Sequence, residues 1–227
     1  MANTLPWALS HTQIAVEAVA TIAFALSGLI EGARKRLDAV GICVVAGLAA
    51  FGGGTVRDIL LDRRPLFWVQ HPGWVWILLS LCVGAMLFMR ARHLDPTERA
   101  MQWPDALGLG LFTAVGTQIA IDASMPAVIA VILGMITAVF GGVLRDIVCN
   151  EIPKAFSDHR PYAICSFAGG WVMVTAHAGG LPQWGALMAA ASTATALRMA
   201  AVLLDWRLPA WQAGVAPKDR SEDPPRR

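Results

Sequence analysis

The stretch FGGGTVRDILLDRRP at residues 51–65 decides the fold, because three glycines and a charged pair lie at the end of a long apolar run that begins at Ala39. At a helical rise of ~1.5 Å per residue, Gly53 lies about 21 Å along that run. Arg57 and Asp58 therefore fall within the ~30 Å depth of a hydrocarbon core. A charge there costs at least ~2.5 kcal/mol, so we expect both side chains to face a protein-lined or watery interior with a partner.

The same pattern returns at residues 140–153, FGGVLRDIVCNEIP. The two copies match without a gap at a constant offset of 88 residues. The matched pairs are Gly53 and Gly141, Gly54 and Gly142, Arg57 and Arg145, Asp58 and Asp146, Ile59 and Ile147, and Pro65 and Pro153. Phe24 and Gly28 match Phe112 and Gly116 at the same offset. Because residues that are rare in apolar helices recur in register, composition does not explain the match, and we interpret it as an internal duplication.

The composition excludes most soluble proteins. Of the 227 residues, 56% are hydrophobic and only 15% are charged, whereas about 25% are charged in an ordinary soluble domain. A net charge of +2 is too small to indicate binding to nucleic acid. We therefore expect an integral membrane protein whose surroundings are a lipid bilayer, with no nucleic-acid partner.

Seven apolar runs predict an all-α integral membrane protein with seven transmembrane helices. The runs cover residues 14–30, 39–61, 74–89, 106–121, 127–149, 163–178 and 186–204. The first six runs form two groups of three, and each copy of the motif ends the second helix of its group. Because a group has an odd number of helices, the second group enters the membrane from the opposite side. The predicted architecture is two inverted three-helix repeats, at about 12–90 and 105–178, followed by a seventh helix at about 184–205.

The basic residues predict the orientation of the chain. Thirteen of the 18 flank the runs on one side: Arg34, Lys35, Arg36, Arg90, Arg92, Arg99, Lys154, Arg160, Arg207, Lys218, Arg220, Arg226 and Arg227. Only Arg63 and Arg64 lie on the other side. The positive-inside rule then places the N-terminus outside and the C-terminus in the cytoplasm. We expect one membrane domain over 1–208 and a disordered cytoplasmic tail over 209–227, which is rich in proline and mixed charge.

Other interpretations of the glycine motif remain open. The glycines could serve helix packing alone, with Arg57 and Asp58 beginning an interfacial turn that continues through Arg63 and Arg64. The inverted second copy favours a functional role, since both helices would otherwise carry the same costly charges for packing. A phosphate-binding loop fits less well, because neither copy has the required ending or glycine spacing. Glu17 could line the same interior or reach the interface.

The sequence predicts neither a cofactor nor a metal site. The five histidines are scattered, and the four cysteines have no CxxC spacing. No Ser/His/Asp, HExxH or paired-carboxylate constellation of a membrane enzyme is present. We therefore expect a protein that is not an enzyme.

With GGGTVRD in the second helix and FGGVLRD followed by NEIP in the fifth, the sequence resembles the prokaryotic members of the trimeric intracellular cation (TRIC) channel family over about residues 10–205. The resemblance implies a homotrimer with one ion pathway in each protomer, bounded by the first, second, fourth and fifth helices. It also implies that the second and fifth helices kink at the pore. The implied pathway residues are Gly52, Gly53, Gly54, Arg57, Asp58, Gly141, Gly142, Arg145 and Asp146. The lysine-containing phosphoinositide motif of the animal members is absent, so the resemblance gives no expectation of lipid control.

Two functions fit these features. The first is a passive channel for monovalent cations, potassium above sodium, in a bacterial inner membrane, with Asp58 and Asp146 offsetting the arginines so that cations enter. The second is a secondary transporter for a small solute such as glycine, because inverted repeats with broken helices are also typical of alternating access.

Overall fold

The computed structural model describes residues 10–92 and 97–209, and within these ranges the regular structure is entirely helical. The helices are α1 (His11–Arg34), α2 (Ala39–Leu60), α3 (Phe67–Gln70), α4 (Gly73–Arg92), α5 (Glu98–Asp122), α6 (Ala127–Val148), α7 (Lys154–Ser157), α8 (Ala163–Ala178) and α9 (Gln183–Leu203). Apart from Pro209, the predicted tail lies outside the described residues.

Polar side chains define where several long helices begin. Ser10 accepts from the backbone N–H of Gln13, whose side chain bonds back to Ser10 and completes a capping box at α1. Asp38 caps α2 in a similar way, and Thr97 caps α5. Each cap satisfies a backbone N–H that has no partner within the helix.

Every predicted apolar run lies within one helix or ends one residue beyond it, at the C-cap, and the all-helical membrane class is confirmed. Five helices, α1, α2, α5, α6 and α9, are long and apolar enough to cross a bilayer. Two shorter apolar helices, Gly73–Phe88 within α4 and Ala163–Ala178, account for the remaining runs. The count of seven membrane-spanning helices stays a prediction. The sequence did not predict α3 and α7, two helices of four residues that follow the two copies of the motif.

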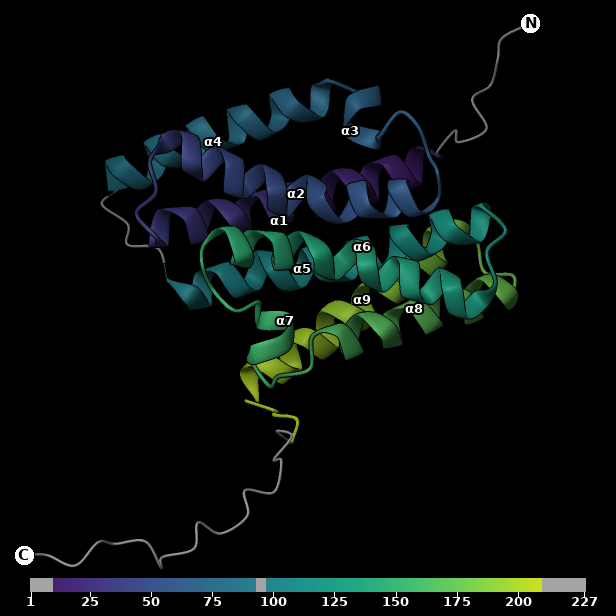
Figure 1. Cartoon of the computed structure of the whole chain (residues 1–227). Coiled ribbons are helices and arrows are strands. Elements are labelled where there is room, and N and C mark those ends of the chain that lie inside the picture. The colour runs from purple at the N-terminus through teal and green to yellow at the C-terminus, as the bar shows by residue number, and fades with distance from the viewer. Residues whose placement is uncertain (1–9, 93–96, 210–227) are drawn as a thin grey trace, which may run out of the picture.

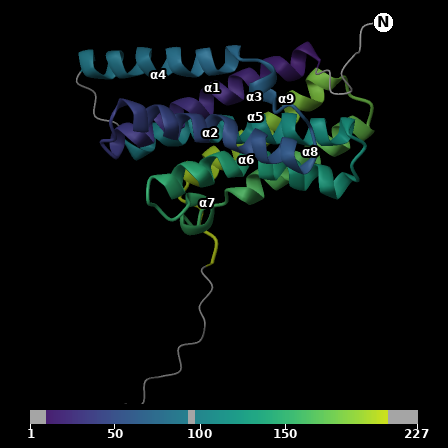
Figure 2. The same cartoon turned by 45° about the horizontal axis from the view of Figure 1, so that its top comes forward.

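The long helices form three stacked pairs (Figure 1). The pair α1/α2 packs on α5/α6, and α8/α9 packs on the opposite side of α5/α6. Helix α4 lies outside the first pair, against α1 and α2, as both views show (Figure 2). Helix α5 is central, since it contacts α1, α6, α8 and α9.

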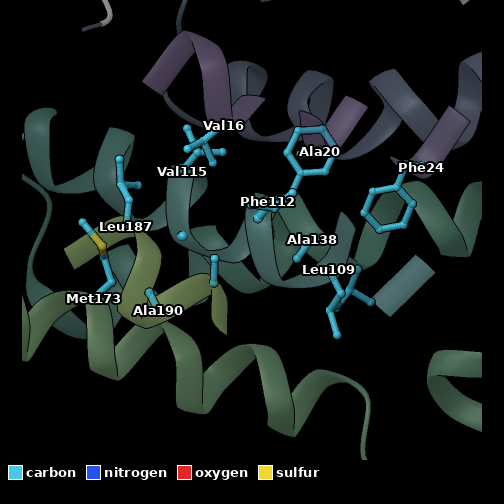
Figure 3. Close-up of a cluster of buried hydrophobic side chains, with 14 of the residues drawn as sticks. Val16, Ala20, Phe24, Leu109, Phe112, Val115, Ala138, Met173, Leu187 and Ala190 are labelled. Atoms are coloured by element: carbon cyan, nitrogen blue, oxygen red, sulfur yellow. The ribbon is translucent and has the colours of Figure 1, made fainter. Parts of the chain in front are cut away.

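The main core joins these layers through two aromatic rings (Figure 3). Phe24 of α1 and Phe112 of α5 stack with their ring centroids 5.5 Å apart, and both are fully buried. Gly108 makes room for this pair, because a Cβ atom there would lie 2.5 Å from the ring of Phe24. The two phenylalanines are counterparts at the 88-residue offset, so equivalent positions meet at the centre of the bundle.

Candidate functional site: two buried charge clusters

The first motif forms a buried charge cluster, which we define as Glu17, Arg57 and Asp58. Arg57 Nη1 lies 2.9 Å from Glu17 Oε1, and Arg57 Nε donates to Asp58 Oδ1 at 2.9 Å. The backbone N–H of Phe67, the first residue of α3, donates to Asp58 Oδ2 at 2.9 Å. All three charged side chains are at most 2% exposed. The cluster thus holds its charges by mutual pairing away from solvent.

The second motif forms an equivalent cluster of Asp105, Arg145 and Asp146. Arg145 Nη1 lies 2.5 Å from Asp105 Oδ1, and Arg145 Nε donates to Asp146 Oδ1 at 2.8 Å. The hydroxyl of Tyr162 donates to Asp105 Oδ2 at 2.8 Å. Ser27 of α1 contacts both Arg145 and Asp105 through its hydroxyl. This cluster therefore joins α5 and α6 to α1 and to the start of α8.

The two clusters correspond residue by residue. Asp105 lies 88 residues after Glu17, as Arg145 lies 88 residues after Arg57. In each cluster an arginine bridges the adjacent aspartate and a carboxylate from a neighbouring long helix. The aspartate then accepts the first backbone N–H of a short helix, α3 in one case and α7 at Lys154 in the other. The local geometry is therefore built the same way twice.

The clusters lie at opposite ends of the bundle (Figure 1). The first lies where α1 begins and α2 ends, and the second lies where α5 begins and α6 ends. Arg63, which the sequence analysis placed in the connection after the second helix, is only 2% exposed, and its Nη1 lies 3.7 Å from Asp58 Oδ1. With Arg63 the first group is formally neutral, whereas the second keeps one more carboxylate than arginine.

The glycines of the motif bring α2 and α6 into backbone contact. A Cβ atom on Gly53 would lie 1.9 Å from the carbonyl oxygen of Thr137, and one on Gly141 would lie 2.2 Å from that of Ala49. These two contacts are also counterparts at the 88-residue offset. Both helices stay α-helical through their glycines, and the implied kinks at these positions stay a prediction. The glycines act here by permitting close approach.

The remaining predicted glycines line the same region. A Cβ atom on Gly52 would meet Leu144 at 2.6 Å, and one on Gly54 would meet the ring of Phe67 at 2.5 Å. Gly142 faces Tyr162, whose hydroxyl would lie 3.3 Å from an added Cβ atom. The structure thus brings the nine predicted residues onto two helices that cross at the glycines, with the charges near the helix ends. Among the described residues no group of three or more possible metal ligands is present.

Sequence reasoning left Glu17 open and missed Asp105, Ser27 and Tyr162. Asp105 could have been found, because the 88-residue offset carries Glu17 directly onto it. Ser27 and Tyr162 carry no such signal, since their role depends on how α1 and α8 pack against α5. Hydroxyl groups in apolar helices are common, and only the fold shows which of them meet a buried charge.

At the same end as the second cluster, further ion pairs link the connecting loops. Lys35, which follows α1, pairs with Glu151, and Lys154 Nζ lies 3.1 Å from Glu98 Oε1. The ammonium group of Lys35 lowers the pKa of Glu151 from its ordinary value. The Lys35–Glu151 pair is partly exposed, so it contributes little to stability compared with the buried clusters.

Replacing Tyr162 with phenylalanine tests the second cluster. The substitution removes the hydroxyl that donates to Asp105 and leaves a buried carboxylate oxygen short of a partner. We expect a loss of about 1–3 kcal/mol in unfolding free energy, measured by thermal denaturation in detergent. Thr175→Val is the control, because its exposed hydroxyl bonds only within α8. Equal stability of both variants would contradict the role assigned to Tyr162.

Comparison with known proteins places the chain in a family. A family model described as "Glycine transporter" matches residues 14–92 and 102–178. A UPF0126 membrane protein of Vibrio cholerae serotype O1 is 32% identical over 198 residues, which cover 86% of this chain and 80% of the relative. The UPF0126 inner membrane protein YadS of Escherichia coli K12 is 32% identical over 199 residues, covering 86% and 93%.

A solved structure shares the fold. It is the TRIC trimeric intracellular cation channel orthologue from Rhodobacter sphaeroides, with a TM-score of 0.80 and 31% identity over 86% of this chain and all of that chain. By its motifs, its family model and these relatives, the chain belongs to the membrane protein family that unites the "Glycine transporter" model and the UPF0126 proteins with the prokaryotic TRIC channels.

Proposed function

We propose that this chain is a passive channel for monovalent cations, with potassium preferred, in a bacterial inner membrane. The observation that carries the proposal is the pair of buried charge clusters at opposite ends of the four helices α1, α2, α5 and α6. The second cluster keeps one more carboxylate than arginine, so a cation that enters at that end meets fixed negative charge with its own hydration partly replaced, whereas Arg63 makes the first group formally neutral. The TRIC fold of the related channel structure supports the same function.

The proposed pathway is lined by the nine residues of the two motifs, together with Glu17 and Asp105. It runs within one protomer, and three protomers assemble as a homotrimer. We infer seven membrane-spanning helices as two inverted repeats and a seventh helix, with the N-terminus outside and the C-terminus in the cytoplasm. The recurrence of charge pairs, glycine contacts and aromatic contacts at one offset supports this duplication. Transport, and not catalysis, is the proposed activity.

The crossing of α2 and α6 is the proposed gate. No methyl group fits between Gly53 and the carbonyl of Thr137, or between Gly141 and the carbonyl of Ala49. A hydrated potassium ion cannot pass a contact that excludes a methyl group. Conduction therefore requires α2 and α6 to separate at the glycines, while the charge clusters stay at the two ends.

The second candidate function is secondary transport of a small solute such as glycine. Two observations favour it: the family model carries the description "Glycine transporter", and the clusters flank a closed crossing from both ends. A carrier would open one cluster at a time to its own side of the membrane. A channel opens both together, and this difference separates the two functions.

Purified full-length protein in a planar bilayer under a potassium gradient tests the proposal. We expect discrete unitary currents that reverse at the potassium equilibrium potential, and currents in potassium at least as large as in sodium. Native mass spectrometry in mild detergent tests the trimer in the same preparation. The absence of current, together with saturable uptake of labelled glycine into proteoliposomes, would refute the channel and favour the carrier.

A further inference from the structure

A cavity of about 570 Å³ lies between the start of α5 and the end of α9, outside both charge clusters. Its polar side consists of Glu98, Arg99 and Arg160, and its apolar side includes Trp103, Val202 and Leu203. This combination of a charged rim and an apolar wall has no part in the proposed ion pathway. The cavity therefore needs an explanation of its own.

The cavity lies where these two helices meet the surface of the bilayer. Both α5 and α9 are apolar enough to cross a membrane, and the cavity is formed by the first residues of α5 and the last residues of α9. Trp103 is 57% exposed and Leu203 is 68% exposed, so the apolar wall faces outward. A half-exposed tryptophan between charged and apolar residues is typical of the membrane interface.

One positive charge of the rim, that of Arg99, has no counter-charge among the described residues and favours an anion. Glu98 is paired with Lys154, whose Nζ lies 3.1 Å away. Arg160 is held in place by Asp205, through contacts of 2.6 Å and 2.9 Å, and its Nη1 contacts Asp158 at 3.3 Å. Within the described parts of the chain, Arg99 has neither an ion pair nor a hydrogen bond through its side chain. The rim therefore keeps Arg99 available to a ligand, whereas the charge of Arg160 is balanced by two aspartates.

We propose that this cavity binds the headgroup of an anionic phospholipid, with Arg99 at its phosphate and an acyl chain along Trp103, Val202 and Leu203. A guanidinium group suits phosphate oxygens because it donates parallel N–H bonds. Basic pockets between helices at the cytoplasmic side of a membrane bind such headgroups. The apolar wall distinguishes a lipid from free phosphate, which has no chain to bury.

Native mass spectrometry of the full-length protein, titrated with phosphatidylglycerol or with phosphatidylcholine of the same chains, tests this site. We expect phosphatidylglycerol to bind more tightly, and Arg99→Gln to weaken its binding about fivefold, which is the share of one basic side chain near the membrane surface. Arg36→Gln is the matched control, because Arg36 is exposed at the same end of the molecule but does not line the cavity. The Arg36→Gln variant should bind phosphatidylglycerol as tightly as the unmodified protein does.

Three results would overturn the site. The first is equal binding of the two lipids, and the second is an equal loss in Arg36→Gln and in Arg99→Gln. The third is displacement of phosphatidylglycerol by millimolar inorganic phosphate with the same dependence on Arg99, which would make the cavity a site for free phosphate. Since binding is measured without ion flow, the outcome does not depend on whether the protein conducts.

Discussion

Replacing Arg145 with alanine is expected to lower the unitary potassium current at least tenfold and to cost about 3–5 kcal/mol of stability. The stability loss follows because Asp105 and Asp146 lose the cation that pairs them inside the protein. The current falls because uncompensated carboxylates hold a cation too tightly for it to leave. Bilayer recording and thermal denaturation measure the two effects in one preparation. Arg57→Ala should act in the same way on the first cluster.

A paired substitution separates conduction from stability. Arg145→Met combined with Asp105→Asn removes one positive and one negative charge, so stability should return in part while the current stays altered. Arg64→Ala is the control, because Arg64 is exposed in the loop after α2. Arg63 cannot serve, since it is buried beside Asp58. If Arg145→Ala and Arg64→Ala conduct alike, the clusters have only a structural role.

The second large effect is expected at the crossing of α2 and α6. Gly53→Ala and Gly141→Ala each place a methyl group against the backbone of the other helix, at 1.9 Å and 2.2 Å from a carbonyl oxygen. Backbone cannot rotate away as a side chain can, so the helices must move apart. We expect each substitution to cost about 1–3 kcal/mol and the double variant to cost more, measured as the unfolding midpoint in detergent.

Gly84→Ala supplies the control for these substitutions. Gly84 lies in α4, and a Cβ atom there has no neighbour within 4 Å in the described structure. Alanine in place of this helical glycine should therefore be neutral or stabilise by about 0.5–1 kcal/mol. Unfolding midpoints of Gly53→Ala and Gly141→Ala that match that of Gly84→Ala would exclude the close contact of α2 with α6.

Much of the fold could be predicted from the sequence, because hydropathy is a local property. Except for α5, which begins at Glu98, eight residues before its apolar run, the long helices begin and end within a few residues of the runs. Caps such as Ser10 and Asp38 stand directly before their helices. The short helices α3 and α7 could not be predicted in this way. They are held by the side chains of Asp58 and Asp146, which accept their first backbone N–H groups.

The candidate site was predicted only in part. The duplicated motif indicated which arginines and aspartates belong to it, since a charge within an apolar helix requires a partner. It did not indicate that the glycines pack against a carbonyl 84 or 92 residues away, because that contact depends on how α2 crosses α6. The predicted kinks at the glycines stay a prediction, while the structure shows close approach of α2 and α6 at these positions.

By itself, the sequence determined that the protein lies in lipid, where its helices run, and that one charged glycine motif occurs twice. Only the tertiary structure decided that Glu17 and Asp105 complete the two clusters and that Ser27 and Tyr162 join the second. The physical reason is distance along the chain. The hydropathy pattern that places a helix is read from neighbouring residues. The ion pairs of Arg57 with Glu17 and of Arg145 with Asp105 each join positions 40 residues apart, and only the packing of the helices brings these side chains together.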